Sequence, residues 1–200
     1  MKKIGIMGGT FNPIHNGHLF LAEHAYEQAG LDYVLFMPTL NPPHKAGMTV
    51  ESAEHRLNMV RLAIQSNPHF MMSDLELQRQ GITYTSDTLK ALKNEEPENE
   101  YYFIVGADSL MMMAKWMEPQ TVFNLSTILA GAREQYSVEQ LKEQAAYLEN
   151  TYNGKIILLD MPLIEISSEN IRERVIKGKS IQYYVPDEVV SYMKEHHLYT

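Results

Sequence analysis

Residues 3–18 read Lys3-Ile4-Gly5-Ile6-Met7-Gly8-Gly9-Thr10-Phe11-Asn12-Pro13-Ile14-His15-Asn16-Gly17-His18. The first five are mostly apolar and are followed by glycines, which is typical of a buried strand that ends in a loop. Apolar residues then recur at helical spacing from Leu19 to Ala29, and Gly30 follows as a helix C-cap. A strand, a glycine-bearing loop and a helix in this order predict the beginning of an open α/β sheet.

Short apolar runs and amphipathic stretches alternate along the rest of the chain in the same way. The predicted strands cover residues 3–7, 33–37, 70–77, 101–105, 127–130 and 155–159. After the helix at 19–29, further helices are predicted at 53–66, 85–92, 138–149, 168–177 and 186–196. The alternation indicates an α/β fold, with an open, mainly parallel sheet and helices on both faces.

Length and composition indicate an ordinary globular protein. The 200 residues are enough for one core and too few for two ordinary domains, so we expect a single domain over residues 1–200. Apolar residues make up 44% of the chain, and no segment approaches the roughly 20 apolar residues of a membrane span. The basic start precedes an apolar run too short for a signal peptide. We therefore expect a cytoplasmic protein with no membrane contact.

The formal net charge is −8, and the chain contains no cysteine. A general nucleic-acid binder would present a basic face, so the charge argues against a nucleic-acid partner. A small anionic substrate remains compatible, because local cations and backbone N–H groups can outweigh distant charges that are screened over about 10 Å. The lack of cysteine excludes disulfides, thiolate catalysis and cysteine-ligated zinc. The sequence leaves both a monomer and a homo-oligomer open.

The loop after the first strand is the most informative segment. In open parallel sheets ligands bind at the carboxyl ends of strands, and glycines there let backbone N–H groups approach a phosphate. The loop matches neither a Walker A sequence nor a dinucleotide-binding fingerprint. Instead, His15 and His18 lie three residues apart, so both rings can face one anion beside the N-terminus of the first helix. The alternatives are two surface histidines or a zinc pair, for which no third ligand is suitably spaced.

This loop resembles the signature Gly-x-Phe-x-Pro-x-His-x-Gly-His of the HIGH-type nucleotidyltransferases. Every fixed position is matched, by Gly9, Phe11, Pro13, His15, Gly17 and His18. The resemblance implies a Rossmann-like fold and a catalytic role for His15 and His18. It also implies that ATP contacts Gly8, Gly9, Thr10, Phe11 and Gly17.

The segment Ile166-Ser167-Ser168-Glu169-Asn170-Ile171-Arg172 resembles the second motif of this family, Ile-Ser-Ser-Thr-x-Ile-Arg. Ser167 or Ser168 can N-cap the predicted helix, and Arg172 follows one turn later, where it can donate to phosphate oxygens. A capped surface helix would have the same appearance. The resemblance implies that Ile166, Ser167 and Ser168 contact ATP and that Arg172 is catalytic. Glu169 stands where the family usually has threonine.

Four further segments are similar to the bacterial nicotinate-nucleotide adenylyltransferases: Pro43-His44-Lys45, Tyr84-Thr85, Gly106-Ala107-Asp108-Ser109 and Lys115-Trp116. The resemblance implies that the acceptor contacts Thr85, Lys115 and Trp116, with the indole stacked on a pyridine ring. It implies that ATP contacts Lys45, Gly106, Asp108 and Arg133. The alternatives are core packing for Trp116, a helix N-cap for Thr85, a turn residue for Asp108, and solvated surface charges for Lys45 and Arg133.

The reaction implied by the resemblance is adenylyl transfer from ATP to nicotinate mononucleotide, which gives deamido-NAD and pyrophosphate in NAD biosynthesis. Mg²⁺ is expected to arrive with ATP, because the sequence offers no evident carboxylate cage for a resident metal. Two alternatives stay open. The acceptor could instead be nicotinamide mononucleotide or phosphopantetheine, or the protein could be a non-catalytic nucleotide sensor.

Overall fold

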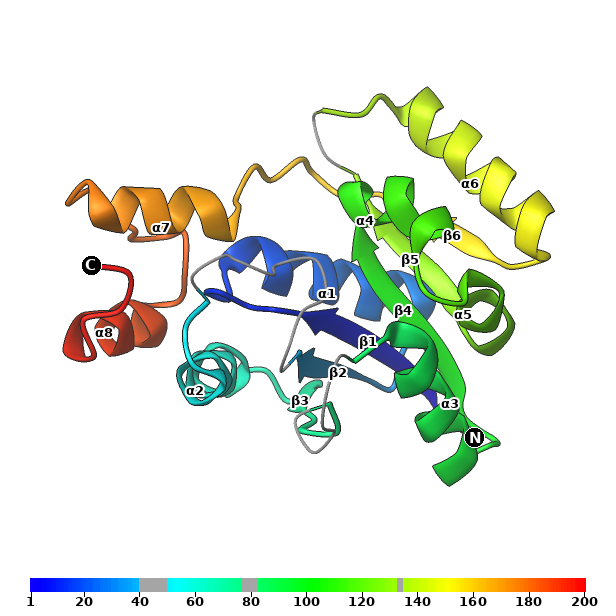
Figure 1. Ribbon diagram of the computed structural model, residues 1–200, viewed down its shortest axis with the longest axis horizontal. Coiled ribbons are helices and arrows are strands. Elements are labelled where there is room, and N and C mark those ends of the chain that lie inside the picture. The colour runs from blue at the N-terminus through cyan, green and yellow to red at the C-terminus, as the bar shows by residue number, and fades with distance from the viewer. Residues whose placement is uncertain (40–49, 77–82, 133–134) are drawn as a thin grey trace.

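The computed structural model describes residues 1–39, 50–76, 83–132 and 135–200. Within these ranges six strands form one sheet in the order β3-β2-β1-β4-β5-β6, and every neighbouring pair is parallel (Figure 1). The strands are β1 (Lys3–Gly9), β2 (Tyr33–Pro38), β3 (Phe70–Met72), β4 (Glu100–Gly106), β5 (Thr127–Gly131) and β6 (Ile156–Leu158). The predicted Rossmann-like α/β fold is confirmed.

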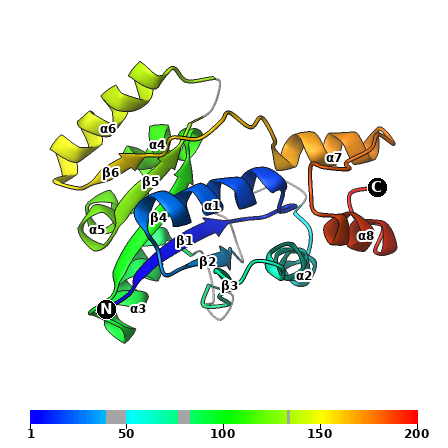
Figure 2. The same ribbon diagram turned by 180° about the vertical axis from the view of Figure 1, so that it is seen from behind.

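Helices connect the strands and continue after the last one. They are α1 (Asn16–Ala29), α2 (Ala53–Ile64), α3 (Thr85–Glu95), α4 (Ala107–Met112), the short 3₁₀ helix η2 (Met113–Lys115), α5 (Pro119–Leu125), α6 (Val138–Tyr152), α7 (Ser168–Ile176) and α8 (Asp187–Glu195). Figures 1 and 2 show α7 and α8 together beyond the end of the sheet toward which β1 points.

Two buried hydrophobic clusters cover the two faces of the sheet. One contains side chains from α1, α2, α7 and α8, and the other contains side chains from α3, α4, α5 and α6. Strand β4 contributes to both, because Phe103 and Val105 belong to the second cluster and Ile104 to the first. Successive strand residues point to opposite faces, so a sheet buried on both sides requires the nearly continuous apolar runs seen in the sequence.

The direction of the chain through the sheet reverses between β1 and β4. Strands β2 and β3 extend from one side of β1, whereas β4, β5 and β6 extend from the other. Such a reversal leaves a crevice outside the carboxyl ends of the two central strands, where open α/β sheets bind ligands. Gly9 ends β1 and Gly106 ends β4, so both predicted loops open into this region.

The structure corrects two predictions of secondary structure. The strand predicted at 70–77 ends at Met72. The backbone N–H of Ser73 still donates to the carbonyl of Phe36 in β2, but the N–H of Leu75 donates to the Ser73 hydroxyl instead, so the pairing with β2 does not continue. No helix was predicted between residues 106 and 127, yet α4, η2 and α5 occupy most of that segment. Pro119 at the first turn of α5 is a helix-start signal that the sequence does contain.

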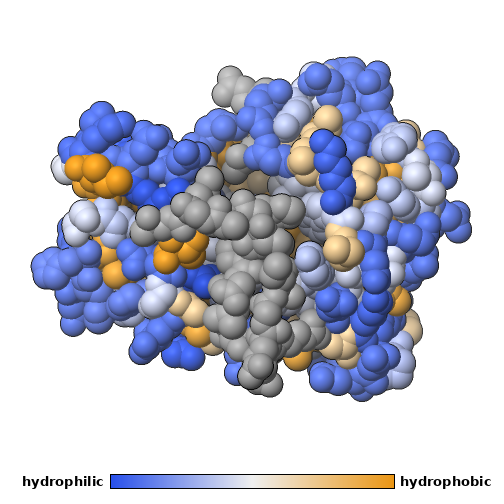
Figure 3. All heavy atoms as spheres, viewed as in Figure 1, coloured by the Kyte–Doolittle hydropathy of each residue, from blue (hydrophilic) through white to orange (hydrophobic). Residues whose placement is uncertain are grey.

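No helix in the described ranges is both long and apolar enough to cross a membrane. The face shown in Figure 3 is mainly hydrophilic, and its hydrophobic residues form small separate groups, including one over the α7 and α8 region.

Candidate active site

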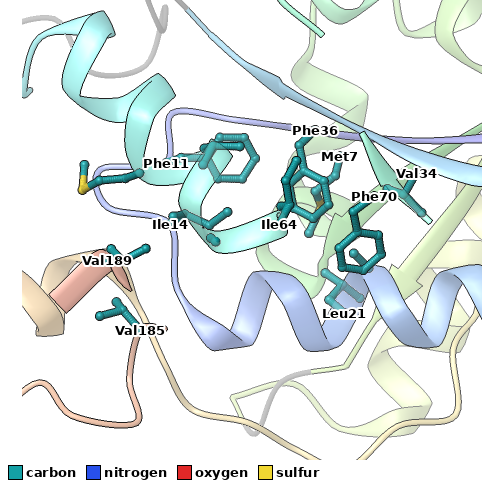
Figure 4. Close-up of a cluster of buried hydrophobic side chains, with 14 of the residues drawn as sticks. Met7, Phe11, Ile14, Leu21, Val34, Phe36, Ile64, Phe70, Val185 and Val189 are labelled. Carbon is teal, nitrogen blue, oxygen red and sulfur yellow. The ribbon is translucent and has the colours of Figure 1, made fainter. Parts of the chain in front are cut away.

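Phe11 gives the loop between β1 and α1 its shape. Its backbone has a left-handed conformation with φ of 48°, and its side chain is only 2% exposed. The Phe11 and His18 rings pack edge to face, with their centroids 5.1 Å apart. Figure 4 shows Phe11 and Ile14 pointing into the core. A Cβ atom at Gly9 would lie 3.2 Å from this ring, so the tight packing explains why glycine occupies that position. The Asn12–Pro13 peptide bond is cis.

His15 and His18 lie together at the start of α1, as predicted. Their rings stack with centroids 3.6 Å apart, and His15 is the N-cap residue of the helix. The backbone N–H of His15 donates to Nδ1 of His18 at 3.3 Å, so a neutral His18 ring carries its proton on Nε2. His15 is buried and His18 is half-buried. The stacked pair therefore lies at a helix N-terminus, where anions are favoured.

Gly17 lets the start of α1 pack closely against both His15 and Ile166. A Cβ atom at this position would lie 3.1 Å from Nδ1 of His15 and 3.5 Å from Cβ of Ile166. The first contact is tighter than side chains normally make, and the second is an ordinary van der Waals distance. Ile166 thus lies directly against the start of α1, although it is far away in the sequence.

The second motif is bonded to the first loop through backbone oxygens. The Ser167 hydroxyl accepts from the N–H of Asn170 at 3.1 Å and is the N-cap of α7. The Ser168 hydroxyl instead donates to the Pro13 carbonyl at 2.8 Å. Arg172 Nη1 donates to the carbonyl of Asn12, also at 2.8 Å. The two motifs therefore form one site, and the two serines have different roles.

Gly106 and Asp108 lie at the end of β4, where the sequence placed them. Gly106 is the N-cap of α4, and a Cβ atom there would meet nothing within 4 Å. Asp108 is half-buried in the first turn of α4 and accepts from the side chain of Gln135. A carboxylate at a helix start is electrostatically favourable, so Asp108 is a helix residue rather than an ordinary turn residue.

The residues predicted to contact the acceptor come from two neighbouring elements. Trp116 is half-buried and meets Phe103 of β4 edge-on, with ring centroids 5.9 Å apart, whereas Lys115 is exposed. Phe103 also lies 3.4 Å from the Cβ position of Gly8, which connects Trp116 to the end of β1. Trp116 therefore packs on the edge of the core cluster that contains Phe103, and its half-burial leaves part of the side chain accessible.

Thr85 is the first residue of α3, and the N-cap is Tyr84, so the N-cap alternative for Thr85 is wrong. Helix α3 is linked to the segment after Trp116 by an ion pair between Lys90 and Glu118, with 2.5 Å between Nζ and Oε2. This pair is exposed and contributes little to stability, but it shows that α3 lies beside the Trp116 segment.

Lys45 and Arg133, together with Pro43 and His44, lie outside the described residues. Within the described ranges no group of three or more histidine, aspartate or glutamate side chains is arranged to hold a metal ion.

Sequence reasoning missed three polar residues in or beside the loop: the buried Asn12 and Arg56, and the half-buried Tyr199. Arg56 is 1% exposed, and its guanidinium donates to backbone carbonyls. One signal could have identified it, because Arg56 shares the helical spacing of the buried residues Met59, Val60 and Ala63 of α2. A charge on an apolar helix face needs buried partners.

Burial also shifts the ionisation of two of these residues. It lowers the pKa of Arg56, although the nearby Tyr199 opposes the shift. It raises the pKa of Tyr199, as does the negative charge of Glu51, while Arg172 and Arg56 act in the opposite direction. The Tyr199 hydroxyl therefore stays protonated at neutral pH and acts as a hydrogen-bond donor.

The fold and the joined motifs define a nucleotidyltransferase. The model of the cytidylyltransferase-like family matches residues 6–174, and the chain belongs to that family. A probable nicotinate-nucleotide adenylyltransferase of Lachnoclostridium phytofermentans is 46% identical over 199 residues, which is 100% of both chains. Another from Dehalococcoides mccartyi is 44% identical and covers 98% of this chain and 97% of its own. The chain is thus a member of the nicotinate-nucleotide adenylyltransferase family.

A solved structure supports the fold independently. It is described as Plasmodium falciparum nicotinic acid mononucleotide adenylyltransferase complexed with NaAD. The two chains superpose with a TM-score of 0.83 at 21% identity, and the match covers 100% of this chain and 98% of the other.

Proposed function

We propose that this chain transfers the adenylyl group of ATP to nicotinate mononucleotide, producing deamido-NAD and pyrophosphate in NAD biosynthesis. The observation that carries the proposal is the union of the two motifs. Ser168 and Arg172 bond the carbonyls of Pro13 and Asn12, directly before the stacked histidines. The identity of the acceptor rests on relatives that carry this activity in their names over the whole chain length.

The reaction is an in-line displacement at phosphorus. An oxygen of the acceptor phosphate forms a bond to the α-phosphorus of ATP, and the bond from that phosphorus to the bridging oxygen of pyrophosphate breaks. A phosphate monoester is largely dianionic near pH 7, because its second pKa lies near 6. The nucleophile therefore needs no protein base, and the protein contributes positioning and charge stabilisation.

The geometry suits this task. The Nε2–H of His18 is directed by the bond at Nδ1, and it can donate to a phosphate oxygen whether the ring is neutral or charged. The bond from Arg172 to Asn12 uses one of the five N–H donors of a guanidinium group, so others can contact the leaving phosphates. The N-termini of α1 and α7 lie next to each other, since Ser168 of α7 bonds the Pro13 carbonyl just before α1, and both N-termini favour negative charge.

The acceptor would lie between the start of α3 and the end of η2. Edge-on packing against Phe103 orients the indole of half-buried Trp116, and an indole face can stack on a pyridine ring. The Thr85 hydroxyl at the start of α3 can donate to the pyridine carboxylate. Lys115 adds an exposed positive charge nearby, while Lys45 and Arg133 remain predicted contacts of ATP.

Magnesium belongs to the substrate in this proposal. Mg²⁺ would arrive coordinated by ATP phosphates and water, as it commonly does where proteins supply few ligands. Asp108 at the end of β4 would accept from ribose hydroxyls rather than hold the metal.

The decisive experiment offers ATP with nicotinate mononucleotide, nicotinamide mononucleotide or phosphopantetheine in separate reactions and measures pyrophosphate release. We expect release to be fastest with nicotinate mononucleotide. Faster release with another acceptor would overturn the substrate assignment and keep the reaction class. ATP binding without release for any acceptor would instead support the non-catalytic sensor.

A further inference from the structure

Asn12 joins its own loop to three other segments of the chain. Its side chain is 2% exposed, and its Oδ1 accepts from the Tyr199 hydroxyl at 2.8 Å and from the backbone N–H of Glu51 at 3.1 Å. Its carbonyl accepts from Arg172. The loop residue is therefore bonded to the chain before α2, to α7 and to the C-terminal segment after α8.

Arg56 supports the same loop from the other side. Its Nη1 donates to the carbonyls of Thr10 at 2.7 Å and Thr39 at 2.8 Å, and its Nε donates to the carbonyl of Glu51 at 3.1 Å. A buried guanidinium is costly unless it is hydrogen-bonded, and here three carbonyls compensate. One side chain thus connects the end of β1, the end of β2 and the start of α2.

Tyr199 reaches the loop from the last residues of the chain. Its backbone is left-handed, with φ of 61°, and its N–H donates to the Glu51 carboxylate at 3.4 Å. The hydroxyl approaches Asn12 rather than any part of α8. A tyrosine held in this way acts on the loop through one hydrogen bond that can be removed without changing the ring.

We propose that Arg56 and Tyr199 are positioning residues that hold the β1–α1 loop in its substrate-binding shape, through the Thr10 carbonyl and the Asn12 side chain. The inference rests on the proposed function, because the loop carries the histidines assigned to phosphate binding. Phe11 within the loop has an uncommon backbone conformation, which persists only where surrounding contacts enforce it. Neither residue needs to touch the substrate for its loss to misplace His15 and His18.

The test compares Tyr199→Phe with Tyr192→Phe. The Tyr192 hydroxyl bonds His55 at 2.9 Å and Asn58 at 3.0 Å, so it joins α8 to α2 without contacting the loop. Both variants lose a tyrosine hydroxyl from the C-terminal region, and both should lose a similar amount of thermal stability. Tyr199→Phe should lower kcat about three- to tenfold, since a misplacement of 1 Å in an active site costs about 10²-fold. Tyr192→Phe should keep kcat within about twofold of wild type, because it breaks no loop contact.

A second measurement needs no substrate. Amide hydrogen exchange in residues 10–18 should be faster in Tyr199→Phe than in wild type, and unchanged in Tyr192→Phe. Unchanged exchange and unchanged kcat in Tyr199→Phe would overturn the inference. Equal losses of kcat in both variants would also overturn it, since they would show a general effect on folding. If wild-type protein releases no pyrophosphate with any acceptor, the proposed function fails, and the exchange comparison still decides this inference.

Arg56→Lys tests the role of the second positioning residue. Lysine keeps the charge but cannot place donors on three carbonyls in the planar geometry of a guanidinium. We expect a larger fall in kcat than in Tyr199→Phe, together with faster exchange in residues 10–18. A folded Arg56→Lys protein with wild-type kcat and exchange would refute the role of Arg56. If this variant does not fold, the comparison of the two tyrosines decides the inference by itself.

Discussion

A methyl group added at Gly17 should reduce activity while leaving stability nearly unchanged. The new Cβ atom would lie 3.1 Å from Nδ1 and 3.2 Å from Cε1 of His15, whereas ordinary contact begins at 3.4 Å. The ring must therefore move by roughly 0.3 Å. Because His15 is buried and stacked on His18, this displacement is passed to the second ring.

The expected change in stability follows from helix propensity and overpacking, which oppose each other, and the expected change in kcat follows from the displacement of the rings. Alanine is more favourable than glycine by up to about 1 kcal/mol in a helix, and slight overpacking costs about 1 kcal/mol, so the two terms oppose each other and the net change is at most about 1 kcal/mol. A shift of roughly 0.3 Å, compared with about 10²-fold lost per 1 Å, predicts about a three- to tenfold lower kcat. That loss corresponds to about 0.7–1.4 kcal/mol in the activation free energy.

The assay is steady-state pyrophosphate release with nicotinate mononucleotide, combined with thermal unfolding of the same Gly17→Ala preparation. We expect Tm within about 4 °C of wild type, which corresponds to about 1 kcal/mol for a chain of this size. Wild-type kcat at unchanged Tm would show that the rings tolerate the methyl group without consequence, and would refute the reasoning. A much larger loss of Tm would refute it as well, because the loop would then have collapsed rather than shifted.

Three other substitutions test individual roles. His18→Ala should lower kcat at least about tenfold without loss of fold, because it removes a donor to the reacting phosphates; His24→Ala, further along α1, serves as the control and should keep wild-type activity. Trp116→Ala should raise KM for nicotinate mononucleotide about tenfold more than KM for ATP, since the stacking face is lost, and equal changes in the two values would argue against the pocket. Gly106→Ala should leave Tm unchanged because the added Cβ meets nothing within 4 Å. A higher KM for ATP in this variant would therefore show that the ligand itself approaches this backbone. An unchanged KM would place the ligand elsewhere.

Local patterns were sufficient for most of the fold. The strands at the centre of the sheet are short apolar runs because both of their faces are buried, and Ser167 caps α7 because a serine side chain accepts from a nearby N–H. The region between β4 and β5 was missed because three short helical pieces follow one another there, and none is long enough for a clear helical period.

The site was predictable where chemistry is encoded in adjacent residues, and not where it depends on packing. His15 and His18 are separated by one helical turn, so their meeting could be inferred from spacing. The bond between Asn12 and Tyr199 joins residues 187 positions apart, and it depends on how α8 packs on α2. No local pattern contains that information.

The bonds around Asn12 also constrain how homologous sequences can diverge. Arg172 contacts the backbone carbonyl of residue 12, so it is indifferent to the side chain at that position. Tyr199 contacts the side chain itself, and its hydroxyl loses its partner when residue 12 is replaced by an apolar residue. Evolution can therefore vary residue 12 independently of residue 172, whereas residues 12 and 199 are expected to change together.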